Sequence, residues 1–240
     1  MARSKEKLQV GLHDEGVVLL HNFFAPEPLN RLRDAASRCF AAIAEGRPVP
    51  DRYRFTQTAH SVLLTALLDF GIDSDEALLA PISADGLAGM FSALLGSRWQ
   101  CRLEHSWARK KFAPRNLPGP GYHLQDWHQD GALGAQFPLQ PGPVAPAFNL
   151  ATCWIPLDAC GRESPGLEFI RQPQPHLLHF TELADTILRR RFPAGAFWAP
   201  ELEFGDGLVF RSDLLHRTHV NDEMRADRMS VEYRIFAEEP

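Results

Sequence analysis

The chain has 240 residues, of which 45% are hydrophobic, 10% aromatic and 23% charged, values typical of folded globular proteins. It carries 25 basic residues (Lys and Arg) against 30 acidic ones, a net charge of −5, and no basic block, which argues against a nucleic-acid partner. The longest apolar run near the N-terminus, 16–20, is too short for a membrane span or a signal peptide, so we expect a cytoplasmic protein with no membrane partner. The four cysteines form no CxxC pair, which indicates neither a disulfide framework nor a cysteine zinc site.

The first hundred residues are predicted to be mostly helical. A short apolar run at 17–20 suits a strand. Apolar residues at three- and four-residue steps then predict a helix that Pro28 opens and Gly46 closes. Two further apolar segments, ended by Gly71 and Gly96, also have a helical pattern. The expected helices therefore span 26–43, 60–70 and 85–95.

From residue 99 onward the pattern changes to short runs of β-branched, aromatic or alternating residues, punctuated by Pro, Gly, Asp and Asn. The expected strand segments are 99–112, 148–157, 167–170, 208–210 and 228–236. These segments predict an all-β core, an antiparallel sandwich or barrel, with flanking α-helices packed outside it. Since no linker divides the chain, we expect one domain over 1–240, with a helix-rich N-terminal region (residues 1–98) and a β core (residues 99–238).

Two long segments rich in proline and glycine, 113–126 and 133–147, are predicted to be loops. Loops of this length without regular structure often serve as lids over a functional site. They flank the segment 127–131, Trp-His-Gln-Asp-Gly, which marks it as a candidate site.

His128 and Asp130 in that segment are two residues apart, so on a strand both side chains would point to the same face. An imidazole and a carboxylate on one face can supply two of the three ligands of a non-haem iron site, the 2-His-1-carboxylate triad. A His-x-Asp pair alone is common, and the third ligand must come from elsewhere. His216 and His219 are the two candidates late in the chain, with His216 preferred.

A candidate anion-binding arginine follows these histidines. Arg228 lies twelve residues after His216 and opens an alternating strand, whereas Arg225 lies in the polar turn 221–227, so Arg228 is preferred. The planar guanidinium of a buried arginine can grip the far carboxylate of a dicarboxylate co-substrate while the other end of that molecule chelates the iron.

Together these motifs resemble the phytanoyl-CoA dioxygenase-like (PhyH-type) family of Fe(II)/2-oxoglutarate-dependent oxygenases. The resemblance runs over nearly the whole chain: the strand 16–24, the helix 26–43, the segment 127–131, the segments 154–158 and 163–170, and the block 216–228. It implies a double-stranded β-helix, the cupin-like jelly roll. It also implies that His128, Asp130 and His216 bind iron, that Arg228 and Thr218 hold 2-oxoglutarate, and that Trp154 lies near that co-substrate.

The resemblance also implies a reaction. We expect hydroxylation of a small-molecule metabolite or biosynthetic intermediate with O₂, releasing succinate and CO₂. Asp130 argues against halogenation, because halogenating relatives have a small residue in place of this carboxylate. Desaturation, epimerisation and cyclisation remain alternative outcomes, and a catalytically silent binding protein with the same fold is the alternative from another class. The chain departs from the family pattern in the spacing of its arginine and in the segment 171–176.

Substrate-contacting residues are the least defined by the sequence. Arg109 and Lys111 alternate onto one face and are close to 127–131 in sequence, so either can meet an acidic group on the substrate; the simpler interpretation is a solvated strand end. Trp127 is either a pocket wall or a core residue. The substrate's identity and the oligomeric state have no signature in the sequence.

Overall fold

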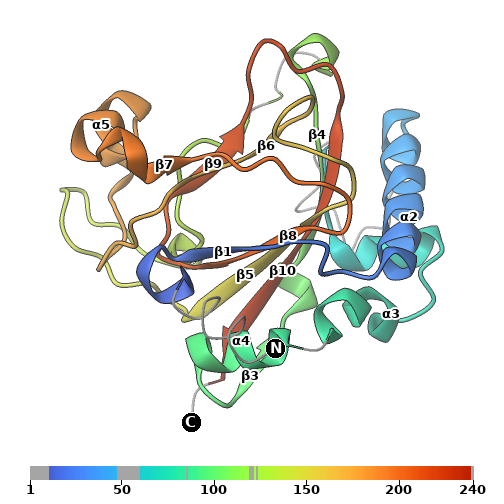
Figure 1. The fold of residues 1–240 in the computed structure, drawn as a ribbon, viewed down its shortest axis with the longest axis horizontal. Coiled ribbons are helices and arrows are strands. Elements are labelled where there is room, and N and C mark those ends of the chain that lie inside the picture. Colours follow the sequence, from blue (N-terminus) through green and yellow to red (C-terminus); the bar gives the residue numbers. More distant parts are fainter. Residues whose placement is uncertain (1–10, 48–59, 85, 119–121, 123, 239–240) are drawn as a thin grey trace.

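A computed structural model of the chain describes residues 11–47, 60–84, 86–118, 122 and 124–238. Two antiparallel sheets face each other across an interior (Figure 1). The larger has the order β1-β8-β5-β10-β4-β2, with β3 also paired to β10, and the smaller has the order β7-β6-β9. The strands are β1 Val17–Leu20, β2 Ser61–Leu63, β3 Trp99–Cys101, β4 Trp107–Lys111, β5 Leu150–Pro156, β6 Gly166–Ile170, β7 Phe197–Trp198, β8 Gly207–Arg211, β9 His216–His219 and β10 Arg228–Ala237. This is the predicted jelly roll, with its sheets not closed into a barrel.

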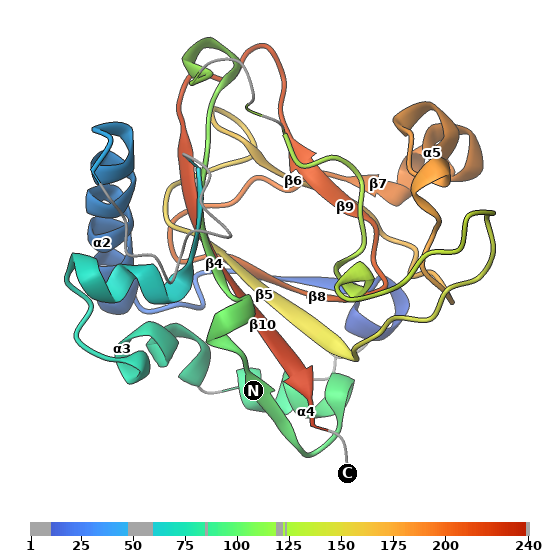
Figure 2. The same ribbon diagram turned by 180° about the vertical axis from the view of Figure 1, so that it is seen from behind.

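The α-helices whose full extent lies in the described ranges flank the sheets: α2 Pro26–Ala44, α3 Asp75–Leu79, α4 Leu87–Leu95 and α5 Asp185–Arg191. The connections contain short 3₁₀ helices: η2 Leu64–Phe70, η3 Ala80–Ser83, η4 Leu103–His105, η5 Pro114–Asn116, η6 Asp130–Ala132, η7 Phe180–Glu182 and η8 Ala194–Ala196. Figure 2 shows α2, α3 and α4 gathered on the outer side of the larger sheet, while α5 lies apart, beside the smaller sheet.

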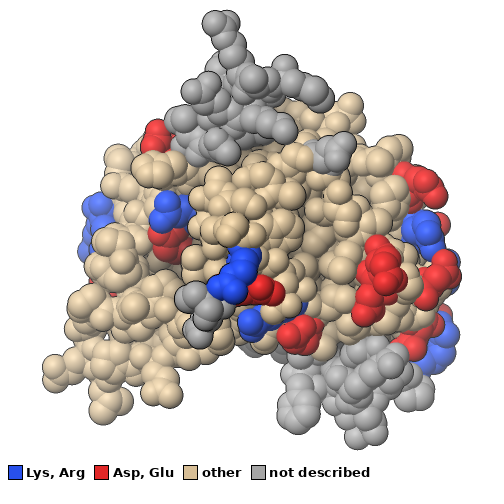
Figure 3. All heavy atoms as spheres, turned by 90° about the horizontal axis from the view of Figure 1, so that it is seen from below, with Lys and Arg blue, Asp and Glu red and all other residues tan. Residues whose placement is uncertain are grey.

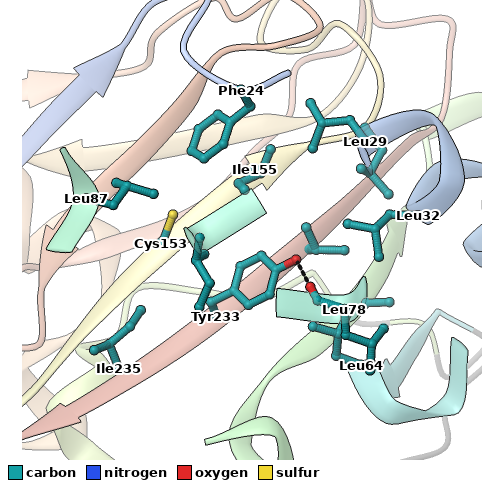
Figure 4. Close-up of a cluster of buried hydrophobic side chains, with 14 of the residues drawn as sticks. Phe24, Leu29, Leu32, Leu64, Leu78, Leu87, Cys153, Ile155, Tyr233 and Ile235 are labelled. Atoms are coloured by element: carbon teal, nitrogen blue, oxygen red, sulfur yellow. Dashed lines mark hydrogen bonds between the residues drawn. The ribbon is translucent and has the colours of Figure 1, made fainter. Parts of the chain in front are cut away.

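The main hydrophobic core lies between the larger sheet and these helices. Alternate residues of its two central strands point toward the helices, among them Cys153 and Ile155 on β5 and Tyr233 and Ile235 on β10 (Figure 4). The hydroxyl of Tyr233 donates a hydrogen bond of 2.7 Å to the backbone carbonyl of Leu78 on α3, so β10 is tied to the helical layer.

The opposite faces of these strands line the interior between the sheets, and on β10 most of the residues there are polar. On β10 the inward positions are Arg228, Ser230, Glu232 and Arg234, all buried. Polar groups at this depth need partners, since burying an unpaired one is costly. A cluster of buried polar residues of this kind marks the interior of the jelly roll as the candidate functional site.

Most elements predicted for the N-terminal region are confirmed: the strand β1, the helix α2, which ends near Gly46 at a positive φ of 70°, and the helix α4. The helix predicted over 60–70 is wrong in its first residues. Ser61–Leu63 form the edge strand β2, which pairs with β4, and only Leu64–Phe70 are helical, as a 3₁₀ helix. Pairing with a strand distant in sequence overrides the local helical pattern there. Thus the helix-rich N-terminal region also contributes β1 and β2 to the larger sheet.

No single helix in the described ranges is long and apolar enough to cross a membrane; the stretches Asp75–Ser83 and Leu87–Leu95 reach that length only as a pair bent by 85°. On the face of the molecule in Figure 3, basic side chains lie singly or beside acidic ones.

Candidate metal centre

The two histidines at the centre of the site lie side by side because their backbones pair. His128 and His216 form an isolated antiparallel bridge, exchanging two N–H···O bonds of 3.0 Å each. His216 opens β9, but the segment around His128 is not the regular strand that the sequence suggested, since Asp130 begins η6. Gln129 between them is nevertheless extended (φ −123°, ψ 130°), so the alternation of side chains holds locally.

The side chain of Gln129 points away from those of His128 and Asp130, as the alternation requires. Its amide donates to the carbonyl of Asp213 at 2.8 Å and accepts from the backbone N–H of Leu178 at 2.7 Å. The backbone N–H of Gly131 is bound to the carbonyl of Ser212 at 2.8 Å. These contacts anchor the segment on both sides of Asp130 and leave the side chains of His128 and Asp130 facing the interior.

His128, Asp130 and His216 offer ligand atoms that lie within 4.8 Å of one another. The Oδ1 atom of Asp130 is 3.8 Å from Nε2 of His128 and 3.7 Å from Nε2 of His216. The Nδ1 atom of each histidine lies close to a backbone carbonyl, that of Asp126 at 2.7 Å and that of Leu214 at 3.1 Å. A proton on each Nδ1 satisfies these contacts and leaves the Nε2 atoms as the metal-binding ones. Nε2 of His128 accepts a hydrogen bond of 2.8 Å from the Gln125 amide, which a bound metal would replace.

The surroundings of His128 and Asp130 favour their metal-binding protonation states. Burial, followed by the nearby His216, lowers the pKa of His128 to about 3, so its imidazole is neutral. Burial alone would raise the pKa of the Asp130 carboxyl, but the Arg234 guanidinium, the two histidines and the Thr152 hydroxyl hold it well below its ordinary value. Histidine nitrogens and a carboxylate are the donor set of a non-haem iron site.

His216, and not His219, is the histidine that the fold brings to this cluster. The side chains of His216 and Thr218 are buried on the same face of β9, while His219 lies on the opposite face and is half-buried. Thr218 is further fixed by a 3.0 Å bond from its backbone N–H to the carbonyl of Gln125.

Arg228 lies in the interior at the start of β10 and is 1% exposed. Its Nε donates to the carbonyl of Pro165 at 2.8 Å and its guanidinium carbon lies 4.8 Å from the centre of the Trp154 ring. The indole Nε1 of Trp154 is buried and has no hydrogen-bond partner among the described residues. Arg225 is exposed and donates to backbone carbonyls within its own turn.

A second cation accompanies Arg228. Lys111 on β4 lies directly opposite Arg228 in the register of β4 and β10 and is 3% exposed. Burial, and then the charges of Arg109 and Arg228, lower the pKa of Lys111 to about 8. Within the described ranges neither Lys111 nor Arg228 forms an ion pair with a carboxylate. Two buried cations and an unpartnered indole N–H form a cradle suited to an anion.

The other sequence candidates have partners of their own. Arg109 donates to Glu232 at 2.8 Å and to the hydroxyl of Ser61 at 2.9 Å. Trp127 is buried behind the smaller sheet, and its Nε1 donates to Asp185 on α5 at 3.0 Å. Of the two roles that the sequence left open for Trp127, this position favours the core.

Three residues near the candidate metal ligands were not predicted from the sequence. Arg234 and Thr152 contact Asp130, and the amide of Gln125 lies 2.8 Å from Nε2 of His128. The alternation of β10 could have placed Arg234 on the face of Arg228, six residues away. Thr152 and Gln125 have no signal in the sequence.

The comparisons with known proteins agree with this geometry. The family model described as phytanoyl-CoA dioxygenase (PhyH) matches residues 12–227. A search of the curated proteins gave no match.

Solved structures with the same fold include enzymes of different outcome. The epimerase SnoN from nogalamycin biosynthesis, in complex with Fe³⁺, α-ketoglutarate and nogalamycin RO, has a TM-score of 0.65 and 16% identity over 98% of this chain and 84% of its own. EctD from S. alaskensis with bound Fe has a TM-score of 0.67 and 19% identity, covering 99% and 76%. The carbocyclase SnoK from nogalamycin biosynthesis has a TM-score of 0.62 and 16% identity, covering 96% and 83%.

Proposed function

Because the chain belongs to the phytanoyl-CoA dioxygenase family, we propose that it is an Fe(II)/2-oxoglutarate-dependent oxygenase that hydroxylates a small-molecule metabolite or biosynthetic intermediate. The observation that carries the proposal is the convergence of His128, Asp130 and His216 in the interior of the jelly roll. We propose that residues 1–240 form one catalytic domain, since β1 and β2 of the helix-rich N-terminal region belong to the larger sheet.

The donor set of this cluster fits iron. His128 and His216 would bind it through Nε2, since Nδ1 of each faces a backbone carbonyl, and Asp130 through its carboxylate, whose pKa is held low. When bound, iron and 2-oxoglutarate supply the oxidation, in which O₂ is consumed, the keto acid becomes succinate and CO₂, and a substrate C–H bond is oxidised.

The interior cradle fits the far carboxylate of 2-oxoglutarate. Arg228 would hold that carboxylate, Trp154 would donate its free indole N–H, and Thr218 would contribute its hydroxyl from the face of β9 that carries His216. Lys111 adds a second positive charge opposite Arg228. We therefore extend the sequence prediction for Lys111, from a substrate contact to a co-substrate contact.

The substrate would enter beside the polar interior face of β4, where Arg109 is the candidate contact. Arg109 is already paired with Glu232, so it would present a charge-balanced pair to the substrate and not a free cation. We propose that the loops 113–126 and 133–147 close over the mouth and exclude water; residues 119–121 and 123 lie outside the described ranges. Epimerisation, desaturation and cyclisation are the alternative outcomes.

The first experiment is an anaerobic titration of the metal-free protein with Fe(II) and then with 2-oxoglutarate. A chelated keto acid on Fe(II) gives a weak visible charge-transfer band, and we expect this band with the unaltered protein. His216→Ala should abolish it because iron is lost, and Arg228→Ala should weaken co-substrate binding while iron still binds.

Two neighbouring residues provide matched controls. His219→Ala removes a histidine on the opposite face of β9, and Arg225→Ala removes an exposed arginine, so both variants should keep the band. Iron binding without a band at any concentration of 2-oxoglutarate would contradict the oxygenase and favour the silent binding protein. With the band present, succinate release on addition of candidate substrates identifies the substrate, and mass spectrometry of the product identifies the outcome.

A further inference from the structure

The carboxylate of Asp130 is held by a closed set of hydrogen bonds from the opposite sheet. Arg234 donates to Oδ1 at 2.8 Å, and Thr152 donates from its hydroxyl to Oδ2 at 2.6 Å. Arg234 also donates to the Thr152 hydroxyl at 2.7 Å, which therefore accepts one bond and donates another. Both oxygens of the carboxylate are thus engaged before any ligand is considered.

The two anchoring residues come from the centre of the larger sheet. Arg234 and Thr152 are register partners on β10 and β5, its two central strands, and both are buried. Asp130 itself belongs to the segment that pairs with β9 of the smaller sheet through His128. The contacts therefore cross the interior and fix the position of Asp130 relative to the larger sheet.

Arg234 is itself held in place by a second carboxylate, that of Glu232. It lies 3.3 Å from Glu232, which accepts a bond of 2.8 Å from Arg109. Acidic and basic groups alternate along this chain of contacts, so two carboxylates balance two guanidinium groups. A buried charge that is fully paired holds its place far better than one that is not.

We propose that Arg234, acting with Thr152, is a positioning residue for the metal ligand Asp130, an inference that rests on the proposed function. The pair holds Oδ1 toward the Nε2 atoms of both histidines and keeps Oδ2 on the Thr152 hydroxyl. Oδ1 can accept from Arg234 and bind a metal together, because a carboxylate oxygen has two lone pairs. With Oδ2 engaged, Asp130 binds through one oxygen, which leaves the remaining metal positions to the keto acid and O₂.

The test measures metal affinity, which a purely structural role would not change. Co(II), whose visible spectrum reports coordination, is titrated into the metal-free protein, and thermal unfolding is followed in parallel. Thr152→Val keeps the shape of the side chain but removes both of its hydrogen bonds, and Arg234→Met removes the guanidinium. Loss of such outer contacts weakens metal binding by about 10–100-fold, and we expect this in both variants.

Two further variants complete the test. Thr152→Ser restores the hydroxyl and should restore the affinity of the unaltered protein to within about threefold. Arg102→Met removes an arginine that stacks on Phe236, 4.5 Å from its ring, without contacting Asp130, and should leave Co(II) affinity unchanged. The Co(II) affinity of Arg234→Met is interpreted only if this variant folds. If it does not, the affinity of Thr152→Val, which conserves the side-chain volume, tests the inference alone.

The inference is overturned if folded Thr152→Val binds Co(II) as tightly as the unaltered protein, or if Thr152→Ser fails to restore a lost affinity. It is also overturned if Arg102→Met loses as much affinity as Arg234→Met. Failure of the proposed function looks different: the unaltered protein would then bind no metal at His128, Asp130 and His216, or would form no keto-acid band with Fe(II).

Discussion

Lys111 and Arg228 lie directly opposite each other on the neighbouring strands β4 and β10, both buried, and among the described residues neither forms an ion pair with a carboxylate. Two like charges at this depth repel each other and are both desolvated, so the arrangement costs stability. An arrangement of this kind is explained by a bound anion, and the far carboxylate of a dicarboxylate co-substrate is the anion that the site would receive.

Replacing Lys111 with methionine should raise stability and lower co-substrate binding. The variant removes a buried cation without a partner, so we expect the free energy of unfolding at pH 7 to rise by roughly 1–3 kcal/mol. The affinity for 2-oxoglutarate should fall about 10–100-fold, because one charge-assisted contact is lost. Denaturant unfolding and the charge-transfer titration measure the two effects.

Lys110→Met is the matched control, since Lys110 points to the other face of β4 and its ammonium lies 3.6 Å from Asp227. This variant should leave 2-oxoglutarate affinity unchanged. If Lys111→Met bound the co-substrate as tightly as the unaltered protein, Lys111 would have no role in the cradle.

The lowered pKa of Lys111 predicts a pH dependence of both properties. With a pKa of about 8 in the folded protein, the ammonium loses its proton as the pH rises through 8, so 2-oxoglutarate binding should weaken between pH 7 and 9.5. Unfolded lysine keeps its proton up to about 10.4, so between pH 8 and 10 the unfolded chain binds more protons and this group's contribution to the unfolding free energy rises with pH.

Titrations of 2-oxoglutarate at several pH values would check this, with Lys111→Met measured alongside. The variant should bind weakly at every pH and lack the step near pH 8. An identical step in both proteins would assign the pH dependence to another group.

Tyr233→Phe should destabilise the fold without affecting the site. The Tyr233 hydroxyl donates to the carbonyl of Leu78 from the helical side of β10, away from the polar interior. Loss of this buried bond should lower the free energy of unfolding by about 1–2 kcal/mol. Thermal unfolding measures the change, and unchanged Co(II) affinity would confirm that the two faces of β10 act independently; a loss of metal binding in the folded variant would contradict this.

Which helices and strands could be predicted from the sequence depended on whether they turn a regular apolar face toward the hydrophobic core. The helix α2 and the strands β5 and β10 were predictable because alternate or periodic apolar residues pack in the main core. The strand β9 was not, because its inward residues, His216 and Thr218, are polar and leave no apolar alternation. The apolar outward faces of β5 and β10 revealed those strands, whereas β9 has no such face.

The candidate metal ligands could be proposed from the sequence because their types and order are distinctive, whereas the residues that contact them could not. Thr152 on β5 meets Asp130, at the start of η6, through a tertiary contact that no local pattern specifies. The position of Trp127 could also not be predicted, since a tryptophan suits a pocket wall and a core equally well. Its hydrogen bond to Asp185 in the structure distinguishes the two positions.

Trp154→Phe tests the member of the cradle that lacks a partner. The ring of Trp154 stacks under Arg228, and its indole N–H is buried without an acceptor in the described ranges. Phenylalanine keeps an aromatic ring for the stacking but has no donor, so the affinity for 2-oxoglutarate should fall about 5–30-fold while Co(II) affinity is unchanged. Trp198→Phe, on the half-buried strand β7, serves as the control and should change neither affinity. If Trp154→Phe bound both as the unaltered protein does, the indole N–H would not reach the co-substrate, and the cradle would consist of Arg228, Lys111 and Thr218 alone.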